Sequence, residues 1–225
     1  MAEMIKDINT FTHDALIGGT EVPLLTKVVT LVQGSGTVER GTVLGKITIG
    51  AASVAAKAGG NAANTGLLTL DATTPILAGA KVGVYSVRCI AAASNSGTFR
   101  VTDPEGFVLG DVAVAATFAN NIKFTISDGT QDFVVGEGFN VTIAAGSGKH
   151  KPVNSANVDG SAVVDCVLSQ TVIVPADADA KEEAFSQGFF NGNHLIFGGS
   201  DTLDIHAARL RSLNIITTNE MFKGV

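Results

Sequence analysis

The chain has 225 residues and a mass of 22.9 kDa, enough for one large domain or two ordinary ones, and only 16% of its residues are charged. Although its mean hydropathy is +0.33, no stretch approaches the roughly 18 apolar residues that a membrane-spanning helix needs, so no membrane partner is expected. With 15 basic and 21 acidic residues the net charge is −6, which argues against direct binding to nucleic acid, where affinity depends on neutralising phosphates.

The first 25 residues mix Asn, Thr, Gly and both charge signs without a sustained period, which predicts an extended N-terminal arm. They also lack an apolar run followed by a small-residue cleavage site, so we expect no secretory signal and synthesis and folding in a cytoplasm. Two strands are predicted next, over residues 26–32 and 41–49, because these segments are rich in β-branched residues and the first ends in a glycine-rich turn.

The middle of the chain reads as a separate β module over residues 57–147. Residues 51–64 contain little besides Ala, Gly and Asn and are predicted to be a linker, as are residues 144–148. Between them, short apolar segments predict strands over residues 84–90, 98–102, 107–114, 122–127, 133–135 and 139–143. We therefore predict an inserted, immunoglobulin-like β-sandwich, flanked by a discontinuous core of residues 26–50 and 148–225.

The C-terminal part is predicted to contain three strands and one helix. The strands are expected over residues 163–174, 184–190 and 194–197. The helix is indicated by apolar residues at spacings of four, three and three, with Asp201 or Thr202 as its N-cap and Asn214 at its end. Its predicted buried face consists of Leu203, Ala207, Leu210 and Leu213. The predicted fold class is therefore mainly β with one C-terminal helix (α+β).

Polar clusters that could carry chemistry each have a plainer structural explanation. Residues 146–150 resemble a phosphate loop but lack its first glycine and its final Ser or Thr. The acidic residues form no calcium-loop pattern and read as solvated bends. No nucleophile, base and orienting group can be named together, so we expect no enzyme, no catalytic residue and no cofactor. The acidic groups are Asp177, Asp179, Glu182 and Glu183, and Asp128, Asp132 and Glu137.

The histidines, cysteines and phenylalanines point to structure. The four histidines lie in different predicted elements, so their spacing indicates no metal site: His13, His150, His194 and His206. Cys89 and Cys166 are expected to be buried free thiols. A sugar-stacking platform would favour Trp and Tyr, of which the chain has none and one, so core packing is preferred for Phe99, Phe118, Phe124, Phe133 and Phe139.

Several motifs in the two flanks occur in a recognisable order. They are the segment from Arg40 to Lys46, Asp159-Gly160-Ser161, the acidic bend with Ala178 and Asp179, Gly188-Phe189-Phe190-Asn191 before Leu195, and Phe197-Gly198-Gly199 before a helix end at Arg209 to Ile215. In this order the flanks resemble the head decoration protein family of tailed bacteriophages, the lambda D-like capsid-stabilising proteins. The middle module departs from that pattern and resembles small β-sandwich modules of phage structural proteins.

The resemblance implies a homotrimer on the outer surface of the virion, bound to the major capsid protein at three-fold and quasi-three-fold sites. Such a protein stabilises the expanded head against internal DNA pressure. For the contact we expect a strand added to an exposed sheet edge, made by Pro23, Leu24, Leu25, Thr26, Lys27, Val28, Val29 and Thr30. Two alternatives stay open: a phage tail-tube or fibre component, and a surface module that binds host-surface glycans through the inserted module.

Overall fold

The structure is a computed structural model that describes residues 14–61 and 64–218, with strands over 48% of the chain. The chain divides into two compact units. Unit 1 comprises Met1–Lys46, Lys149–Ser155 and Val163–Val225, and unit 2 comprises Ile47–Gly148 and Ala156–Ala162. Within the described ranges, no helix has the length and apolar character needed to cross a membrane.

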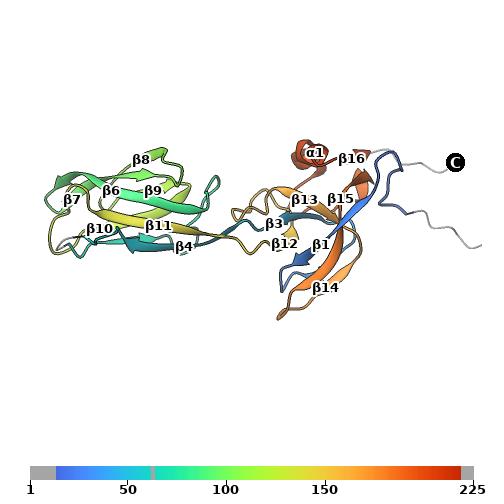
Figure 1. Ribbon diagram of the computed structural model, residues 1–225, viewed down its shortest axis with the longest axis horizontal. Helices are drawn as coiled ribbons and strands as arrows, with labels where there is room; N and C mark the ends of the chain where they lie inside the picture. The colour runs from blue at the N-terminus through green and yellow to red at the C-terminus, as the bar shows by residue number, and fades with distance from the viewer. Residues whose placement is uncertain (1–13, 62–63, 219–225) are drawn as a thin grey trace, which may run out of the picture. The chain divides into compact units, whose positions relative to one another are not determined.

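Unit 1 is built on a ring of five strands. In order around the ring these are β1 (Leu25–Leu31), β12 (His150–Pro152), β3 (Val43–Lys46), β13 (Val164–Leu168) and β15 (Ala180–Asn191). Figure 1 shows β1 lying along β15, with which it pairs antiparallel over its whole length. Parallel pairing of Leu31 with His150 closes the ring. The strand β16 (Ile215–Thr218) extends the sheet beyond β15, while β2 (Gly36–Val38) and β14 (Val172–Val174) pair separately.

The strands β3 and β13 are buried on both faces, so unit 1 has two hydrophobic clusters. One cluster includes Val29, Leu31, Leu44, Cys166 and Leu168. The other includes Leu16, Val43, Val167, Phe190 and Leu210, the last of these on helix α1 (Leu203–Ser212). Two-sided burial accounts for the consecutive apolar residues of β13, because neighbouring side chains of a strand point to opposite faces.

Helix α1 confirms the predicted C-terminal helix, but its buried face differs by one position. His206 and Leu210 are buried, whereas Ala207 is exposed. The reason is that His206 has specific partners, a carboxylate and an aromatic ring, which a methyl group cannot replace. Thr202 is the N-cap, without a side-chain hydrogen bond. Asn214 follows the helix with a φ of 57°, the left-handed conformation that commonly ends helices.

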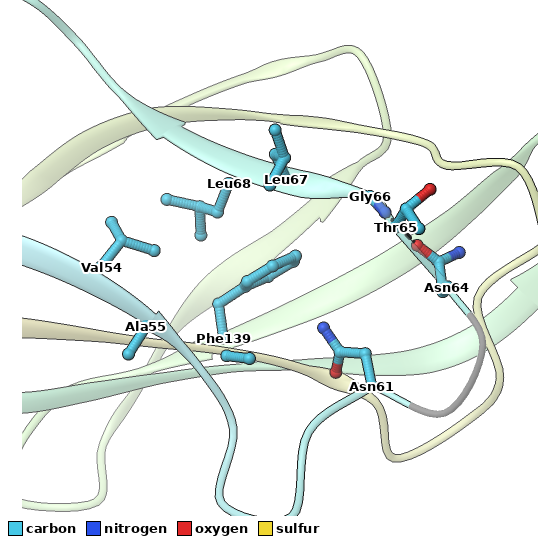
Figure 2. Close-up of a pocket in the computed structure, with 10 residues that line it drawn as sticks. Val54, Ala55, Asn61, Asn64, Thr65, Gly66, Leu67, Leu68 and Phe139 are labelled. Carbon is cyan, nitrogen blue, oxygen red and sulfur yellow. Dashed lines mark hydrogen bonds between the residues drawn. The ribbon is translucent and has the colours of Figure 1, made fainter.

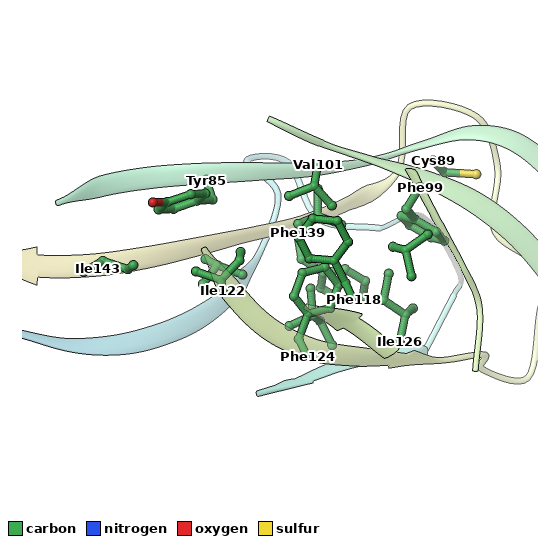
Figure 3. Close-up of a cluster of buried hydrophobic side chains, with 14 of the residues drawn as sticks. Tyr85, Cys89, Phe99, Val101, Phe118, Ile122, Phe124, Ile126, Phe139 and Ile143 are labelled. Atoms are coloured by element: carbon green, nitrogen blue, oxygen red, sulfur yellow. The ribbon is translucent and has the colours of Figure 1, made fainter. Parts of the chain in front are cut away.

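Unit 2 is a β-sandwich with a five-stranded and a three-stranded sheet. The larger sheet has the order β4 (Ile49–Ala56), β11 (Gly138–Ala145), β6 (Gly83–Ala93), β7 (Ser96–Thr102) and β8 (Val108–Ala113). The smaller one has the order β5 (Leu67–Leu70), β10 (Ile122–Ser127) and β9 (Thr117–Asn120). Figure 3 shows the cluster between them, where Phe99, Phe118, Phe124 and Phe139 lie with Tyr85. These phenylalanines and Phe133 are buried core residues, as predicted.

Several predicted element boundaries are wrong. Residues 51–56, predicted to be part of a linker, belong to β4, which pairs with β11 along its length. An edge strand is held by backbone hydrogen bonds to its neighbour, so small side chains are sufficient there. The predicted strand over 41–49 is interrupted after Lys46, and the one over 163–174 is two strands. Phe133 is buried from a loop. His194 ends a short 3-10 helix, Gly192–His194, and residues 195–197 form only the isolated bridge of Ile196 to Thr42 instead of a strand.

Part of the predicted N-terminal arm is packed into the core of unit 1. Leu16 is 3% exposed and lies in the same cluster as Phe190. Gly18 N donates to Phe189 O at 2.8 Å, and Asn191 N donates to Leu16 O at 2.8 Å. Two adjacent apolar residues, Leu16 and Ile17, on an extended backbone are enough for this docking, which the lack of periodicity concealed. Residues 1–13 of the predicted arm lie outside the described residues.

Candidate functional site

The segment chosen from the sequence as the contact strand coincides largely with β1. One edge of β1 is occupied by β15. Among the residues that the structure describes, its other edge is paired only at Leu31, with β12. Before β1 begins, Pro23 O accepts a hydrogen bond from Gln187 Nε2 at 3.2 Å. The predicted segment is therefore held in place by β15 and keeps one open edge.

Exposed apolar side chains follow the same segment. Val28 is 68% exposed, Leu25 51% and Leu24 41%. Natural edge strands are usually protected by charged side chains, prolines or bulges against pairing with other chains. The charged residue of this segment, Lys27, is instead bonded to Asp165 within unit 1. An open edge with apolar residues and a tethered lysine can accept a further strand.

The backbone direction along β1 identifies which residues face the open edge. Val32 N donates to His150 O at 3.0 Å, so the Val32 amide points toward β12. Because backbone groups of a strand alternate between its two edges, the amides of Thr30, Val28 and Thr26 point the same way. At Val28 the N–H group is therefore directed away from β15.

A polar cluster joins β1, β12 and β13, and the sequence analysis did not predict it. Asp165 Oδ2 accepts a hydrogen bond from Lys27 Nζ at 2.7 Å and lies 2.6 Å from His150 Nε2. The hydrogen bond from His150 and the Lys27 ammonium hold the pKa of the Asp165 carboxyl well below its usual range. Cys166 lies beside them, and burial raises the pKa of its thiol to about 12. Lys27 and His150 are remote in sequence from Asp165 and Cys166, and the closed ring brings the three strands together.

A second buried histidine fixes the start of α1. Asp201 bridges Ser155 Oγ at 2.6 Å and His206 Nε2 at 2.7 Å. The His206 ring also stacks on Phe197, with ring centroids 5.3 Å apart. Serine and histidine both bond to the carboxylate here, so no base activates the serine hydroxyl, and the arrangement stabilises the fold rather than supplying a nucleophile.

This network predicts a loss of stability in acid. The hydrogen bonds from Ser155 and His206 lower the pKa of Asp201 from its ordinary value. A carboxylate whose pKa is lowered in the folded state stabilises the protein at pH values above its unfolded-state pKa of about 3.9. This stabilisation is lost as the pH falls through the lower pKa of the folded state. Urea denaturation at about pH 6 and about pH 3 should show a larger loss for the wild type than for Asp201→Asn. Equal losses would contradict the assignment.

Several of the remaining acidic candidates have structural partners, and Glu137, predicted to lie in a solvated bend, is instead buried, with Oε2 accepting a hydrogen bond from Val134 N. Asp179 pairs with Lys149 at 2.7 Å and accepts from Gln33 N, and Glu182 accepts from Gln170. Asp132 accepts from the Asn95 amide. Cys89 and Cys166 are buried free thiols, as expected. None of these groups contributes to a recognisable catalytic arrangement within the described ranges.

A pocket of about 500 Å³ opens between β4 and β5 of unit 2, with Leu68 and Phe139 among its lining residues (Figure 2). Its amide side chains are already used: Asn61 Oδ1 accepts from Gly138 N, and Asn64 donates to Gln131 O. Phe139 is 3% exposed. Among the described residues of unit 2, the exposed aromatic side chain is that of Phe107, which does not line this pocket. The Phe107 ring lies under Lys81, whose Nζ atom is 5.5 Å from the ring centre. The pocket therefore offers no stacking face for a sugar.

The motifs that carry the family resemblance have identifiable structural roles. Arg40 makes a bidentate ion pair with Asp14 and donates to Ser169 O. A Cβ at Gly188 would lie 2.5 Å from Leu24 Cδ2 and 2.9 Å from the Phe190 ring. A side chain at position 188 would therefore have to displace the side chains of Leu24 and Phe190, where the segment before β1 lies against β15. These motif residues maintain the packing around β1 rather than forming a site of their own.

Comparisons with known proteins identify the family. A family model described as bacteriophage lambda head decoration protein D matches residues 5–217 and so includes unit 2 as well as unit 1. No curated protein and no solved structure matches the chain. Because the matched segment covers nearly the whole sequence, the chain belongs to the bacteriophage lambda head decoration protein D family.

Proposed function

We propose that this chain is a capsid-stabilising decoration protein that binds the outer surface of the phage head as a homotrimer at three-fold and quasi-three-fold sites. Its family is a structural one of the phage head, which supports a place in the virion, binding to the capsid and a non-enzymatic role. The observation that supports a specific contact is the open edge of β1, with Val28 68% exposed on it.

The mechanism of stabilisation follows from binding linkage. A protein that binds only the assembled, expanded lattice favours that state by an amount that grows with its concentration relative to the dissociation constant. When three identical contacts are made by one trimer, the second and third are effectively intramolecular, so weak single contacts suffice. Internal DNA pressure on the shell would then be resisted by many such clamps.

The contact itself is proposed to be strand addition. A capsid segment would pair with the backbone of Thr26, Val28 and Thr30, while the exposed side chains of Leu25 and Val28 would cover its apolar residues. Lys27 would stay with Asp165 and leave the edge free of charge. Residues 1–13 precede this strand and would add contacts on the capsid surface.

Unit 2 is proposed to be an insertion that decoration does not require. The register pairs Lys46 of β3 with His150 of β12, so the two strands are neighbours and a two-residue turn can join them. We expect that a variant in which Asn-Gly replaces residues 47–149, and which therefore lacks Lys149 and all of unit 2 except Ala156–Ala162, still folds as unit 1 and still decorates heads. Electron microscopy of heads with the variant and with the full chain should differ only by the density of unit 2.

The same images test the proposal as a whole. Density at three-fold and quasi-three-fold positions on the outside of the head would support it. Rings or fibres without heads would favour the tail-tube or fibre alternative, and failure of the shortened variant to fold would contradict the insertion. Glycan binding by the full chain that is lost in the shortened variant would assign unit 2 to host-surface recognition.

A further inference from the structure

The polar cluster in unit 1 contains the donor atoms of a metal site. One ligand atom each from His150, Asp165 and Cys166 lies within 4.8 Å of the other two. His150 is 6% exposed and Cys166 is fully buried. Nitrogen, oxygen and sulfur donors in one place suit zinc, which binds imidazole, carboxylate and thiolate at about 2.0–2.3 Å.

A second observation is that one ring nitrogen of His150 has no hydrogen-bond partner. Its Nε2 atom lies 2.6 Å from Asp165 Oδ2, whereas its Nδ1 atom is buried and has no hydrogen-bond partner. Buried polar atoms in folded proteins nearly always have a partner. No protein group bonds Nδ1, so the ring proton can move to that atom and leave the lone pair of Nε2, which faces Asp165 Oδ2, for the ion.

The cluster already holds one cation, the ammonium group of Lys27. Lys27 Nζ lies 2.7 Å from Asp165 Oδ2, and the lysine side chain is 35% exposed. The ammonium can therefore move into solvent when another cation takes its place. A divalent ion brings twice the charge to the same carboxylate and can also use the nitrogen and sulfur donors, which an ammonium group cannot.

We propose that His150, Asp165 and Cys166 bind a zinc-type divalent ion in competition with the ammonium group of Lys27. On binding, the Cys166 thiol loses its proton to solvent, a metal–sulfur bond forms, and no oxidation or reduction takes place. His150 Nε2 and Asp165 Oδ2, now 2.6 Å apart, must move apart by about 1 Å or slightly less, because the ligand atoms of a tetrahedral zinc ion lie about 3.4 Å from one another. The site does not require the proposed capsid contact, but metal binding would release Lys27, which lies in the contact strand, into solvent.

Cobalt(II) titration of the full-length, reduced and chelator-treated protein tests this site. Wild-type protein should bind one ion and show the intense near-ultraviolet band of a cobalt–thiolate bond, and zinc should displace the cobalt and abolish the band. Cys166→Ser should lose the band, and His150→Gln should bind at least tenfold more weakly. Cys89→Ala is the matched control, because Cys89 is also a buried free cysteine but lies in unit 2, and its band should be unchanged.

The Lys27→Met variant separates a metal site from a structural ion pair. Removing the competing ammonium should tighten cobalt and zinc binding several-fold, whereas loss of a merely structural pair would only lower stability. Circular dichroism establishes that each variant is folded, and Lys27→Met gives a result even where Cys166→Ser does not fold. The proposal is overturned if the wild type shows no thiolate band, if the band depends on Cys89, or if Lys27→Met binds no more tightly.

Discussion

Replacing Val28 by proline should abolish binding to phage heads while unit 1 stays folded. The Val28 amide points to the open edge of β1, so proline there removes no hydrogen bond to β15. It does remove a donor that an added strand would need, and its ring obstructs pairing at that edge. The variant therefore tests strand addition rather than the stability of the ring.

The expected loss is large because a trimer repeats it three times. A lost backbone hydrogen bond costs about 1–1.5 kcal/mol at each contact, so three contacts weaken binding by roughly 100- to 1000-fold. Sedimentation of heads with labelled protein measures this loss. Val28→Thr keeps the amide and the β-branched shape and should bind nearly as well as the wild type. Equal binding by the proline variant would show that the capsid does not pair with β1.

Replacing Phe99 by alanine should unfold unit 2 at a much lower temperature. Phe99 is fully buried, and its ring meets Phe133 edge-to-face at 4.9 Å between centroids. Truncating a buried phenylalanine costs about 3–5 kcal/mol, which for a domain of this size lowers the melting temperature by more than about 10 °C. Differential scanning calorimetry should resolve an early transition for unit 2.

The transition of unit 1 should be unaffected, because its hydrophobic clusters include no residue of the cluster around Phe99. Head binding should therefore persist at temperatures where unit 2 of the variant has melted. Phe107→Ala is the control: Phe107 is 65% exposed, and its loss should change stability by no more than about 0.5 kcal/mol. A single transition that shifts as a whole would mean that the two units unfold together.

Much of the fold could be predicted from local patterns. β10 matches its predicted bounds, and β1, β6, β7 and β11 differ from theirs by only a few residues, because β-branched runs and turn residues are local signals. The strand β4 was missed because its alanines and serine carry no hydrophobic period, and it forms only because β11 pairs with it. Helix α1 was predicted correctly in position and for Leu203, Leu210 and Leu213 of its packed face, but His206 is buried in place of Ala207, because the aromatic and serine partners of the His206 network are not signalled by helical spacing.

The site was predictable only in part. The contact segment could be chosen from its β-branched residues and the family resemblance, but its open edge depends on the pairing of β1 with β15 and β12. The cluster of Lys27, His150 and Asp165 joins residues up to 138 positions apart. No spacing rule covers such a set, because its members are neighbours only after the ring closes.

The ring of unit 1 draws on both ends of the chain, whereas most of unit 2 is one continuous stretch between Ile47 and Gly148. During synthesis on the ribosome, unit 2 can therefore complete its sandwich before β13 and β15 have emerged. Until β13 and β15 have been synthesised, β1 and β3 lack the strands with which they pair, and their apolar residues stay exposed. Chaperone dependence and misassembly during expression should thus arise from the segments that build unit 1, and slowing translation after residue 148 should aggravate them.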